Sequence, residues 1–339
     1  MKGLYGRKGF DIKLQERAVR AVSGHLVRIR VHACGVCGTD LHFLRDMEDF
    51  TPMGHEISAE VIEVGEAVSR VKIGDRVICE DVSMCGGCAA CKSGRIDLCR
   101  NGHTLEDQPG MSDELVVHEN MLNVFNGIDP VTATMAEPLA VAIRGVDMLK
   151  LRPIESVAIF GMGAIGLFCA AYVKLVGAGR VAMFARTSGS ARNTAAESAA
   201  RELGADEVYY TAEEGYIGKA LEKGAFDAAI IAAPPSLTAD AMQLLGYGGR
   251  ALAMGVSFGS DTSAMLNVSD MVFNKKQLLT SIAEPAMNFP LSIELIRSGR
   301  IDAGRVITHR LKMEDCGKLK ELYAEDSPAI KTVILCNAL

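Results

Sequence analysis

The pattern of hydrophobic positions changes near Leu151. Before this point, short apolar runs are separated by Gly, Asp and Pro, which is typical of short strands joined by turns. The runs are LVRIRVHAC, ISAEVIEVG, DRVICE and DELVVHENMLNVF, all between residues 26 and 125. The pattern therefore predicts a mostly β region from residue 1 to about residue 145.

After Leu151, strands alternate with helices. The segment SVAIFG is apolar at successive positions, as expected for a strand that is buried on both faces. Three further strands are predicted, RVAMFA, FDAAIIAA and GRALAMG, followed by a last one, QLLTSI. The intervening helices are AIGLFCAAYVKLVGA, SARNTAAESAARELGA and LTADAMQLLG. This alternation predicts an α/β fold with a doubly wound parallel sheet.

The alternation ends after about Asn288. There PLSIELIRSGR predicts a helix, and RVITHRL and TVILCN predict two strands. Because the alternation ends here, we expect these segments to return to the first region.

Composition narrows the class of protein. The chain has 339 residues, of which 49% are hydrophobic and 23% charged, as in a globular protein of about two domains. The net charge of −6 argues against nucleic-acid or anionic-lipid partners. The first 14 residues lack an apolar core and no apolar run reaches 18 residues, so neither a signal peptide nor a membrane span is expected. We expect a cytoplasmic protein.

A glycine-rich turn follows the first buried strand. The segment GMGAIG places Gly161, Gly163 and Gly166 in a G-x-G-x-x-G pattern, with a strand before it and a helix after it. This context indicates a dinucleotide-binding turn. The first glycine allows a tight turn, the second lets the pyrophosphate approach, and the third lets helix and strand pack. With Ala164 and Ile165, these glycines are the predicted contacts of the cofactor phosphates, at a helix N-terminus.

The end of the next strand carries a positive charge where a carboxylate usually binds the ribose of NAD. Between Gly161 and Ala196 the chain has no Asp or Glu. It has instead Arg186, Thr187, Ser188, Ser190 and Arg192. Because a guanidinium group binds phosphate through two parallel hydrogen bonds, we expect NADP(H) to be favoured over NAD(H). Arg186, Thr187 and Arg192 are the predicted contacts, although loop arginines of this kind can also be solvated surface charges.

Ten cysteines are many for a chain with no secretion signal, and several of them are clustered. The segment CGGCAACKSGRIDLC spaces Cys85, Cys88, Cys91 and Cys99 as C-x2-C-x2-C-x7-C. Without an oxidising compartment, such spacing indicates metal ligands and not disulfides. Four thiolates close a tetrahedral zinc shell with no open position, so this site is expected to be structural.

A second group of metal-binding residue types is spread over about 100 positions. Cys37, Thr39 and His42 lie in ACGVCGTDLHFL, His55 and Glu56 lie in GHE, and Glu137 lies in MAEPLAVA. Cys, His and carboxylate are all zinc ligands, and a catalytic zinc keeps one position for water or substrate. Spacing leaves it open whether these residues meet, but a carboxylate directly after a histidine favours a metal site.

Taken together, these segments resemble the zinc-dependent medium-chain dehydrogenases of the alcohol dehydrogenase superfamily. GVCGTDLH, GHE, the four-cysteine segment, AEPLAVA and GMGAIGL follow that family's order and approximate spacing over nearly the whole chain. The resemblance is closest to the branch of polyol dehydrogenases, ketose reductases and threonine dehydrogenases. It implies a GroES-like catalytic domain, formed by residues 1–150 and 284–339, and a Rossmann domain formed by residues 151–283.

The resemblance also implies roles for individual residues. Cys37, His55 and Glu56 would hold a catalytic zinc, with Glu137 as a fourth ligand or as a partner of the metal's water. Glu56, Thr39 and His42 would act in catalysis, the last two as a proton relay beside the substrate. The resemblance further implies two zinc ions per chain and a homodimer or homotetramer built through the cofactor domain. It also implies that the segment ART, residues 185–187, is of the type found in NADP-dependent members.

The resemblance implies hydride transfer between a nicotinamide cofactor and a secondary alcohol or ketone of a polyol, sugar or cyclitol. An L-threonine 3-dehydrogenase, or another amino-alcohol dehydrogenase, is the alternative enzyme. A non-enzymatic zinc-binding protein of the same fold is the alternative of another class. A nucleic-acid-binding ribbon is disfavoured, because the cysteine segment has few basic residues and no aromatic one. The loops RDMEDFTPM and GHTLEDQPG are expected to line the pocket of this small hydroxylated substrate.

Overall fold

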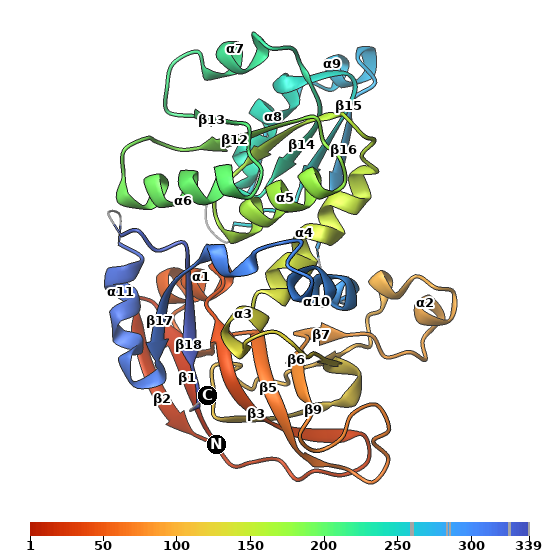
Figure 1. The fold of residues 1–339 in the computed structure, drawn as a ribbon, viewed down its shortest axis with the longest axis vertical. Coiled ribbons are helices and arrows are strands. Elements are labelled where there is room, and N and C mark those ends of the chain that lie inside the picture. Colours follow the sequence, from red (N-terminus) through yellow and green to blue (C-terminus); the bar gives the residue numbers. More distant parts are fainter. Residues whose placement is uncertain (258–260, 283, 285, 325–326, 338–339) are drawn as a thin grey trace.

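A computed structural model describes residues 1–257, 261–282, 284, 286–324 and 327–337. Figure 1 shows two halves, one built around a sheet flanked by helices and one rich in β-strands, with the N- and C-terminal ends both in the β-rich half. The mixed α/β class predicted from the pattern of hydrophobic positions is confirmed.

The helix-flanked half contains a six-stranded, fully parallel sheet. Its strand order is β13-β12-β11-β14-β15-β16, which is the order of a doubly wound dinucleotide fold. The strands are β11 (Ser156–Phe160), β12 (Arg180–Ala185), β13 (Glu207–Tyr210), β14 (Phe226–Ile231), β15 (Leu245–Ala253) and β16 (Gln277–Thr280). The order reverses between β11 and β14, and this reversal opens a crevice at the carboxyl ends of the strands.

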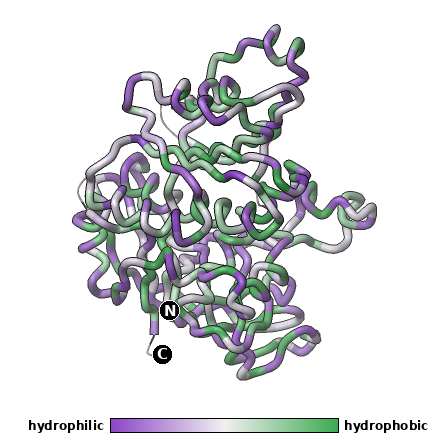
Figure 2. The backbone as a smooth tube through the Cα atoms, turned by 45° about the horizontal axis from the view of Figure 1, so that its top comes forward, coloured by the Kyte–Doolittle hydropathy of each residue, from purple (hydrophilic) through white to green (hydrophobic). Residues whose placement is uncertain are grey.

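Helices cover both faces of this sheet. They are α5 (Ala164–Leu175), α6 (Ala191–Glu202), α7 (Tyr216–Leu221), α8 (Thr238–Leu244) and α9 (Val268–Phe273). The central strands are buried apart from Ser156 and Asp227 near their starts, which explains why the rest of each strand is apolar. Figure 2 shows hydrophobic segments within this half and hydrophilic segments along its outer loops.

The β-rich half contains a seven-stranded sheet and two smaller ones. The large sheet has the order β10-β6-β5-β3-β18-β17, and β9 also pairs with β3. Its strands are β3 (Leu26–Gly35), β5 (Glu56–Val64), β6 (Arg76–Cys79), β9 (Glu114–His118), β10 (Leu122–Val124), β17 (Ile307–Lys312) and β18 (Lys331–Leu335). The small sheets consist of β1 (Lys2–Arg7), β2 (Asp11–Glu16) and β4 (Thr51–Pro52), and of β7 (Val82–Ser83) and β8 (His103–Thr104).

The last strand of the chain lies beside one of the first. β18 runs antiparallel to β3, with Ile334 opposite Cys34, and parallel to β17. Helix α10 (Phe289–Arg297) leads the chain back from the parallel sheet, and α11 (Leu319–Leu322) follows β17 and precedes β18 in the sequence. The β-rich half is thus assembled from both ends of the chain.

The mostly β first region also contains helices that the pattern of hydrophobic positions did not predict. They are α1 (Gly38–Asp46) and α4 (Ala136–Leu149), with single turns at α2 (Ala89–Lys92) and α3 (Pro130–Ala133). Helix α4 was missed because it is buried on most of its circumference, so its sequence lacks a clear polar face. It packs against α5 and α10 and joins the two halves.

Among the residues that the structure describes, no helix combines the length and the apolar sequence that a membrane crossing needs.

Candidate active site and cofactor cleft

Three predicted ligands meet at the junction of α1 and β5. Each of Cys37, His55 and Glu56 offers one ligand atom, and these atoms lie within 4.8 Å of one another. Cys37 is the N-cap of α1, and Glu56 is the first residue of β5, paired with Gly35 on β3. A side chain at Gly35 would collide with Glu56, since its Cβ would lie 1.9 Å from Oε2. Gly35, the first glycine of the CGVCG segment, therefore leaves space for the Glu56 carboxylate.

Asp40 holds the two ligand-bearing segments together. Its carboxylate accepts a 2.8 Å hydrogen bond from the backbone N–H of Cys37 and another of 2.8 Å from that of Gly54. Asp40 is fully buried, and burial raises the pKa of its carboxyl group although both hydrogen bonds oppose this shift. Sequence reasoning gave it no role, yet its position three residues after Cys37 matches a helix-capping carboxylate.

The Glu56 carboxylate has one satisfied and one unsatisfied oxygen. Glu56 is completely buried, and Oε1 accepts a 2.5 Å hydrogen bond from the ammonium group of Lys331, which is itself 4% exposed. Oε2 is buried and has no hydrogen-bond partner among the described residues. A buried carboxylate oxygen is normally paired, so an atom of this kind beside a thiol and an imidazole fits a metal ligand.

The charges around His55 also fit a cation. Burial lowers the pKa of His55, but the adjacent Cys37 and the carboxylates of Asp40 and Glu137 outweigh burial and raise this pKa well above its usual range. The surroundings are therefore strongly negative. A thiolate, an imidazole and a carboxylate are the donor set of a zinc site, and a divalent cation would balance this charge.

Glu137 lies near this group without joining it in the structure. It is the second residue of α4, and it does not belong to the set of atoms within 4.8 Å. Burial and the charge of Glu56 raise its pKa to about 8, against the opposing effect of His55. Its predicted role as a fourth ligand, or as a partner of the metal's water, stays a prediction.

The two predicted relay residues have different surroundings. The Thr39 hydroxyl lies 3.8 Å from the Cys37 sulfur, and Thr39 and His55 both line a cavity of about 320 Å³. The loops predicted to form the substrate pocket both contribute to this cavity, through Thr51 and Pro52 and through residues 104–108. His42 is one turn further along α1, with Nδ1 3.5 Å from a carboxylate oxygen of Asp46, and does not line the cavity.

The four-cysteine segment forms a compact cluster on the lobe around α2, which projects from the body of the molecule in Figure 1. Four of the distances between its sulfur atoms are 3.6, 3.6, 3.8 and 4.0 Å. Four sulfurs at about 2.3 Å from a central zinc ion would be about 3.8 Å apart, so the cluster has the size of a tetrahedral zinc site. Backbone N–H groups of Gly87 and Cys88 lower the pKa of the Cys85 thiol to about 6, which favours the thiolate.

The glycine turn has the geometry that its sequence predicts. Gly161 has a φ of +106°, and a Cβ on Gly166 would lie 1.9 Å from the Gly161 carbonyl oxygen. Helix α5 can therefore approach β11 only because position 166 has no side chain. No described atom lies within 4 Å of a Cβ built on Gly163, the N-cap of α5, so this position is open to a ligand. Ala164 and Ile165 form the first turn of the helix.

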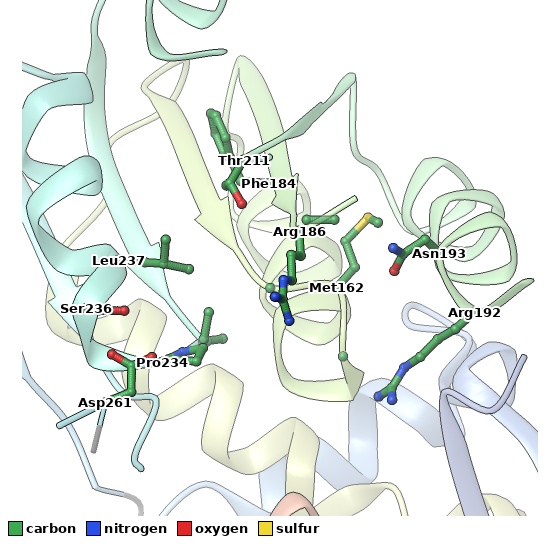
Figure 3. Close-up of a pocket in the computed structure, with 15 residues that line it drawn as sticks. Met162, Phe184, Arg186, Arg192, Asn193, Thr211, Pro234, Ser236, Leu237 and Asp261 are labelled. Atoms are coloured by element: carbon green, nitrogen blue, oxygen red, sulfur yellow. The ribbon is translucent and has the colours of Figure 1, made fainter. Parts of the chain in front are cut away.

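A cavity of about 650 Å³ opens at this turn, at the strand-order reversal. Gly161 and Gly163 line it together with Arg186 and Arg192, and Figure 3 shows both arginine side chains directed into the cavity. Arg186 follows β12 directly, and Arg192 lies on the first turn of α6. Asp261, on the opposite wall, is the one acidic residue among the described lining residues.

Thr187 does not line this cavity. Its hydroxyl accepts a 3.3 Å hydrogen bond from the side-chain amide of Asn193, which also donates to the Thr187 carbonyl. This pairing ties the segment after β12 to α6. Thr187 thus contacts the helix that carries Arg192, whereas its predicted contact with the cofactor remains a prediction.

Comparison with known proteins matches both halves of the chain. The GroES-like domain of alcohol dehydrogenases matches residues 23–125, and the zinc-binding dehydrogenase domain matches residues 164–298. A sorbitol dehydrogenase from Bacillus subtilis (strain 168) is 28% identical over 90% of this chain and 88% of its own length. An L-galactonate-5-dehydrogenase from Escherichia coli (strain K12) is 29% identical over 93% of this chain and 92% of its own length.

A solved structure has the same fold over the whole length. The crystal structure of 2R,3R-butanediol dehydrogenase from Bacillus subtilis covers 99% of both chains with a TM-score of 0.85 and 24% identity.

Proposed function

The chain belongs to the zinc-dependent medium-chain dehydrogenases of the alcohol dehydrogenase superfamily, and on this premise we propose that it interconverts a secondary alcohol of a polyol, sugar or cyclitol and its ketone, with NADP(H). The observation that carries the proposal is the group formed by Cys37, His55 and Glu56. It combines a zinc donor set with an orphaned buried carboxylate oxygen, and His55 lines the cavity that also contains Thr39.

The reaction removes a hydride from the alcohol carbon and a proton from its hydroxyl group. Zinc held by Cys37, His55 and Glu56 would lower the pKa of a hydroxyl group and favour its deprotonation. Thr39 accepts the departing proton on its hydroxyl oxygen and passes its own proton toward solvent, with His42 further along the same helix. Glu137 supplies a second carboxylate at the edge of the site. A nicotinamide cofactor held in the cleft would supply the hydride acceptor.

The cofactor preference rests on the two arginines in the cleft. Arg186 and Arg192 both line the cavity at the end of β12, where a carboxylate would otherwise bind the ribose hydroxyls. A 2′-phosphate placed there would receive charge-assisted hydrogen bonds from both guanidinium groups. We therefore assign NADP(H) to the cleft.

A second zinc ion is assigned to Cys85, Cys88, Cys91 and Cys99. All four ligands come from one projecting lobe, and none lies in the cavity beside His55. This ion would stabilise the lobe and take no part in the chemistry. Reduced metal-binding cysteines agree with a cytoplasmic location.

We further propose a homodimer or homotetramer formed through the cofactor domain. Exposed apolar side chains gather along α9, where Val268, Val272 and Phe273 are 65%, 70% and 80% exposed. Apolar side chains grouped in this way are typical of an interface.

Two variants test the assignment of the metals. Cys37→Ser should remove one zinc ion per chain and abolish turnover, since it removes a ligand beside the substrate cavity. Cys88→Ser should remove the other ion and lower the melting temperature, with activity lost only as far as the fold is lost. Metal content, thermal unfolding and turnover of a sugar-alcohol panel are the measurements. Full turnover by a Cys37→Ser protein without zinc at that site would refute the proposal.

A further inference from the structure

The guanidinium group of Arg192 has no anionic partner in the described part of the chain. Arg192 is half-buried on the first turn of α6 and lines the cofactor cavity, and no residue that the structure describes accepts a hydrogen bond from its guanidinium group. Arg201, on the same helix, is by contrast paired with Glu197 at 2.7 Å. The N–H donors of Arg192 are therefore free to bind a ligand, but no hydrogen bond fixes the direction of this long side chain.

An aromatic ring provides the contact that hydrogen bonds do not. The guanidinium carbon of Arg192 lies 6.0 Å from the centroid of the Tyr323 ring, at the outer edge of the range of a cation–π interaction. Tyr323 directly follows α11, in the β-rich half. Figure 3 shows the Arg192 side chain extending from α6 toward the C-terminal segments, which are drawn in blue. A residue of the β-rich half thus contacts the arginine that the cofactor half presents to the cleft.

The Tyr323 ring is itself held in place by the β-rich half. Tyr323 is 7% exposed, its hydroxyl group donates a 3.2 Å hydrogen bond to the Thr332 hydroxyl oxygen on β18, and its backbone N–H donates to the Leu319 carbonyl oxygen at 3.0 Å. Burial raises the pKa of this hydroxyl group, against its hydrogen bond and the positive charges of Lys331 and Arg192. The ring therefore forms a fixed wall between Arg192 and the last strand.

A second contact holds α6 against the same part of the chain. Arg305, in the turn of residues 303–306, forms an ion pair with Glu202 at the end of α6 and donates a 3.3 Å hydrogen bond to Ser198. Both ends of α6 are thus in contact with the C-terminal region, the last turns through Arg305 and the first turn through Tyr323. The position of the Arg192 guanidinium group therefore depends on both halves of the molecule.

We propose that Tyr323 is a positioning residue for the cofactor, and that its ring holds the Arg192 guanidinium group in the direction in which this group binds the 2′-phosphate of NADP(H). This inference rests on the proposed function and adds a residue of the other half to its cofactor site. A guanidinium group that lies over an aromatic ring keeps its in-plane N–H donors available for a phosphate. A side chain that is already ordered also loses less conformational entropy when the phosphate binds. Because NADH has no 2′-phosphate, the effect is confined to NADP(H).

Substitutions of Tyr323 test this inference in the full zinc-loaded chain. Dissociation constants for NADPH and NADH would be measured by fluorescence titration, and thermal unfolding would show that each variant is folded. Tyr323→Leu removes the ring, and Tyr323→Met removes it with a flexible side chain that fills the vacated space. Each should raise the dissociation constant for NADPH about fivefold and leave that for NADH within about twofold. Tyr323→Phe keeps the ring and should retain the NADPH affinity.

Two further variants separate positioning from packing. Tyr5→Leu is the matched control, because Tyr5 is similarly buried in the β-rich half, at 9% exposed, and its hydroxyl group accepts a hydrogen bond from Arg17, away from the cofactor cavity. It should leave both dissociation constants unchanged. In an Arg192→Ala background, Tyr323→Leu should cause no further loss of NADPH affinity, because Tyr323 acts through Arg192.

The outcomes separate this inference from the proposed function. The role of Tyr323 is overturned by an unchanged NADPH constant in the folded Leu or Met variant, by an equal loss for both cofactors, or by an equal loss in Tyr323→Phe. A further loss of NADPH affinity in the Arg192→Ala background overturns it as well. In each of these cases the NADP(H) assignment still stands. A native chain that binds NADH at least as tightly as NADPH refutes that assignment, and with it this inference.

Discussion

The ammonium group of Lys331 donates a 2.5 Å hydrogen bond to Oε1 of Glu56, and the two residues are 275 positions apart in the chain. Lys331 also donates to the carbonyl oxygen of Val36, next to Cys37, at 3.0 Å. One buried cation from the last strand thus contacts both segments that carry the predicted zinc ligands. It fixes which oxygen of Glu56 faces the metal group.

Lys331→Met should strongly destabilise the protein, because it leaves the Glu56 charge buried without its cation. Breaking a buried ion pair by removing one partner costs about 3–5 kcal/mol. Urea unfolding of the native chain and the variant measures this loss. The double variant Glu56→Gln, Lys331→Met removes both charges and should regain part of the stability. A loss below about 1 kcal/mol in the single variant would mean that Glu56 does not depend on Lys331.

Arg186→Ala should weaken NADPH binding and leave NADH binding nearly unchanged. Loss of charge-assisted hydrogen bonds to one phosphate costs about 1.5–3 kcal/mol, which corresponds to a dissociation constant roughly 10- to 150-fold higher. Fluorescence titration with each cofactor is the measurement. Arg201→Ala serves as a control, since Arg201 pairs with Glu197 on the surface of α6 and does not line the cavity. An equal effect on both cofactors would make Arg186 a general contact and not the residue that selects NADPH.

Gly166→Ala should destabilise the cofactor domain, because the added Cβ would lie 1.9 Å from the Gly161 carbonyl oxygen. Overpacking of this kind typically costs about 1–3 kcal/mol. Gly163→Ala is the matched variant: its Cβ enters open space, so it should fold normally and bind the cofactor less tightly. Thermal unfolding and cofactor titration of both variants separate packing from binding. If the two variants lost stability equally, the close approach at position 166 would not matter.

Glu207 should contribute stability that disappears in acid. Burial raises the pKa of Glu207, but hydrogen bonds from Arg180, Lys223 and Tyr209 outweigh it and lower the pKa from 4.5 to about 2. A lowered carboxylate pKa stabilises the folded state above pH 4.5, and this contribution is lost progressively as the pH falls toward 2.

Glu207→Gln should therefore reduce the free energy of unfolding at pH 7 by roughly 3 kcal/mol, the equivalent of this pKa difference. The gap between the variant and the native chain should narrow as the pH falls below 4.5. Urea midpoints measured from pH 7 to pH 3.5 give the comparison. A gap that stayed constant over this range would show that the charge of Glu207 is not what stabilises the strand edge.

The parallel sheet could be predicted from the sequence because its central strands are mostly buried and are apolar except at Ser156 and Asp227. The edge strand β13 (Glu207–Tyr210) was not predicted, since its residues are half-buried and hydrogen-bond through their polar ends. Helix α4 was missed for the opposite reason. Its buried surface extends around most of the helix, and Pro138 in its first turn resembles a loop residue although the first turn tolerates proline.

The predicted ligands Cys37, His55 and Glu56 stand in short motifs, and the structure brings them together. Their supporting residues could not be found in this way. Lys331 contacts the site only through the pairing of β18 with β3, and Asp40 reaches Gly54 only through the tertiary fold. No local pattern marks a lysine in an apolar strand as the partner of a carboxylate 275 positions earlier.

The return of β18 to β3 determines when the site can form during translation. Ribosomes add about 5–20 residues per second, so Lys331 emerges roughly 15 to 55 seconds after Glu56. Throughout this interval residues 33–35 of β3 lack the strand that later pairs with them, and Glu56 lacks the ammonium group of Lys331. The cofactor domain can fold meanwhile, because all of its sheet precedes Lys331. Metal capture at Cys37, His55 and Glu56 is therefore a late event, completed after the cofactor cleft already exists.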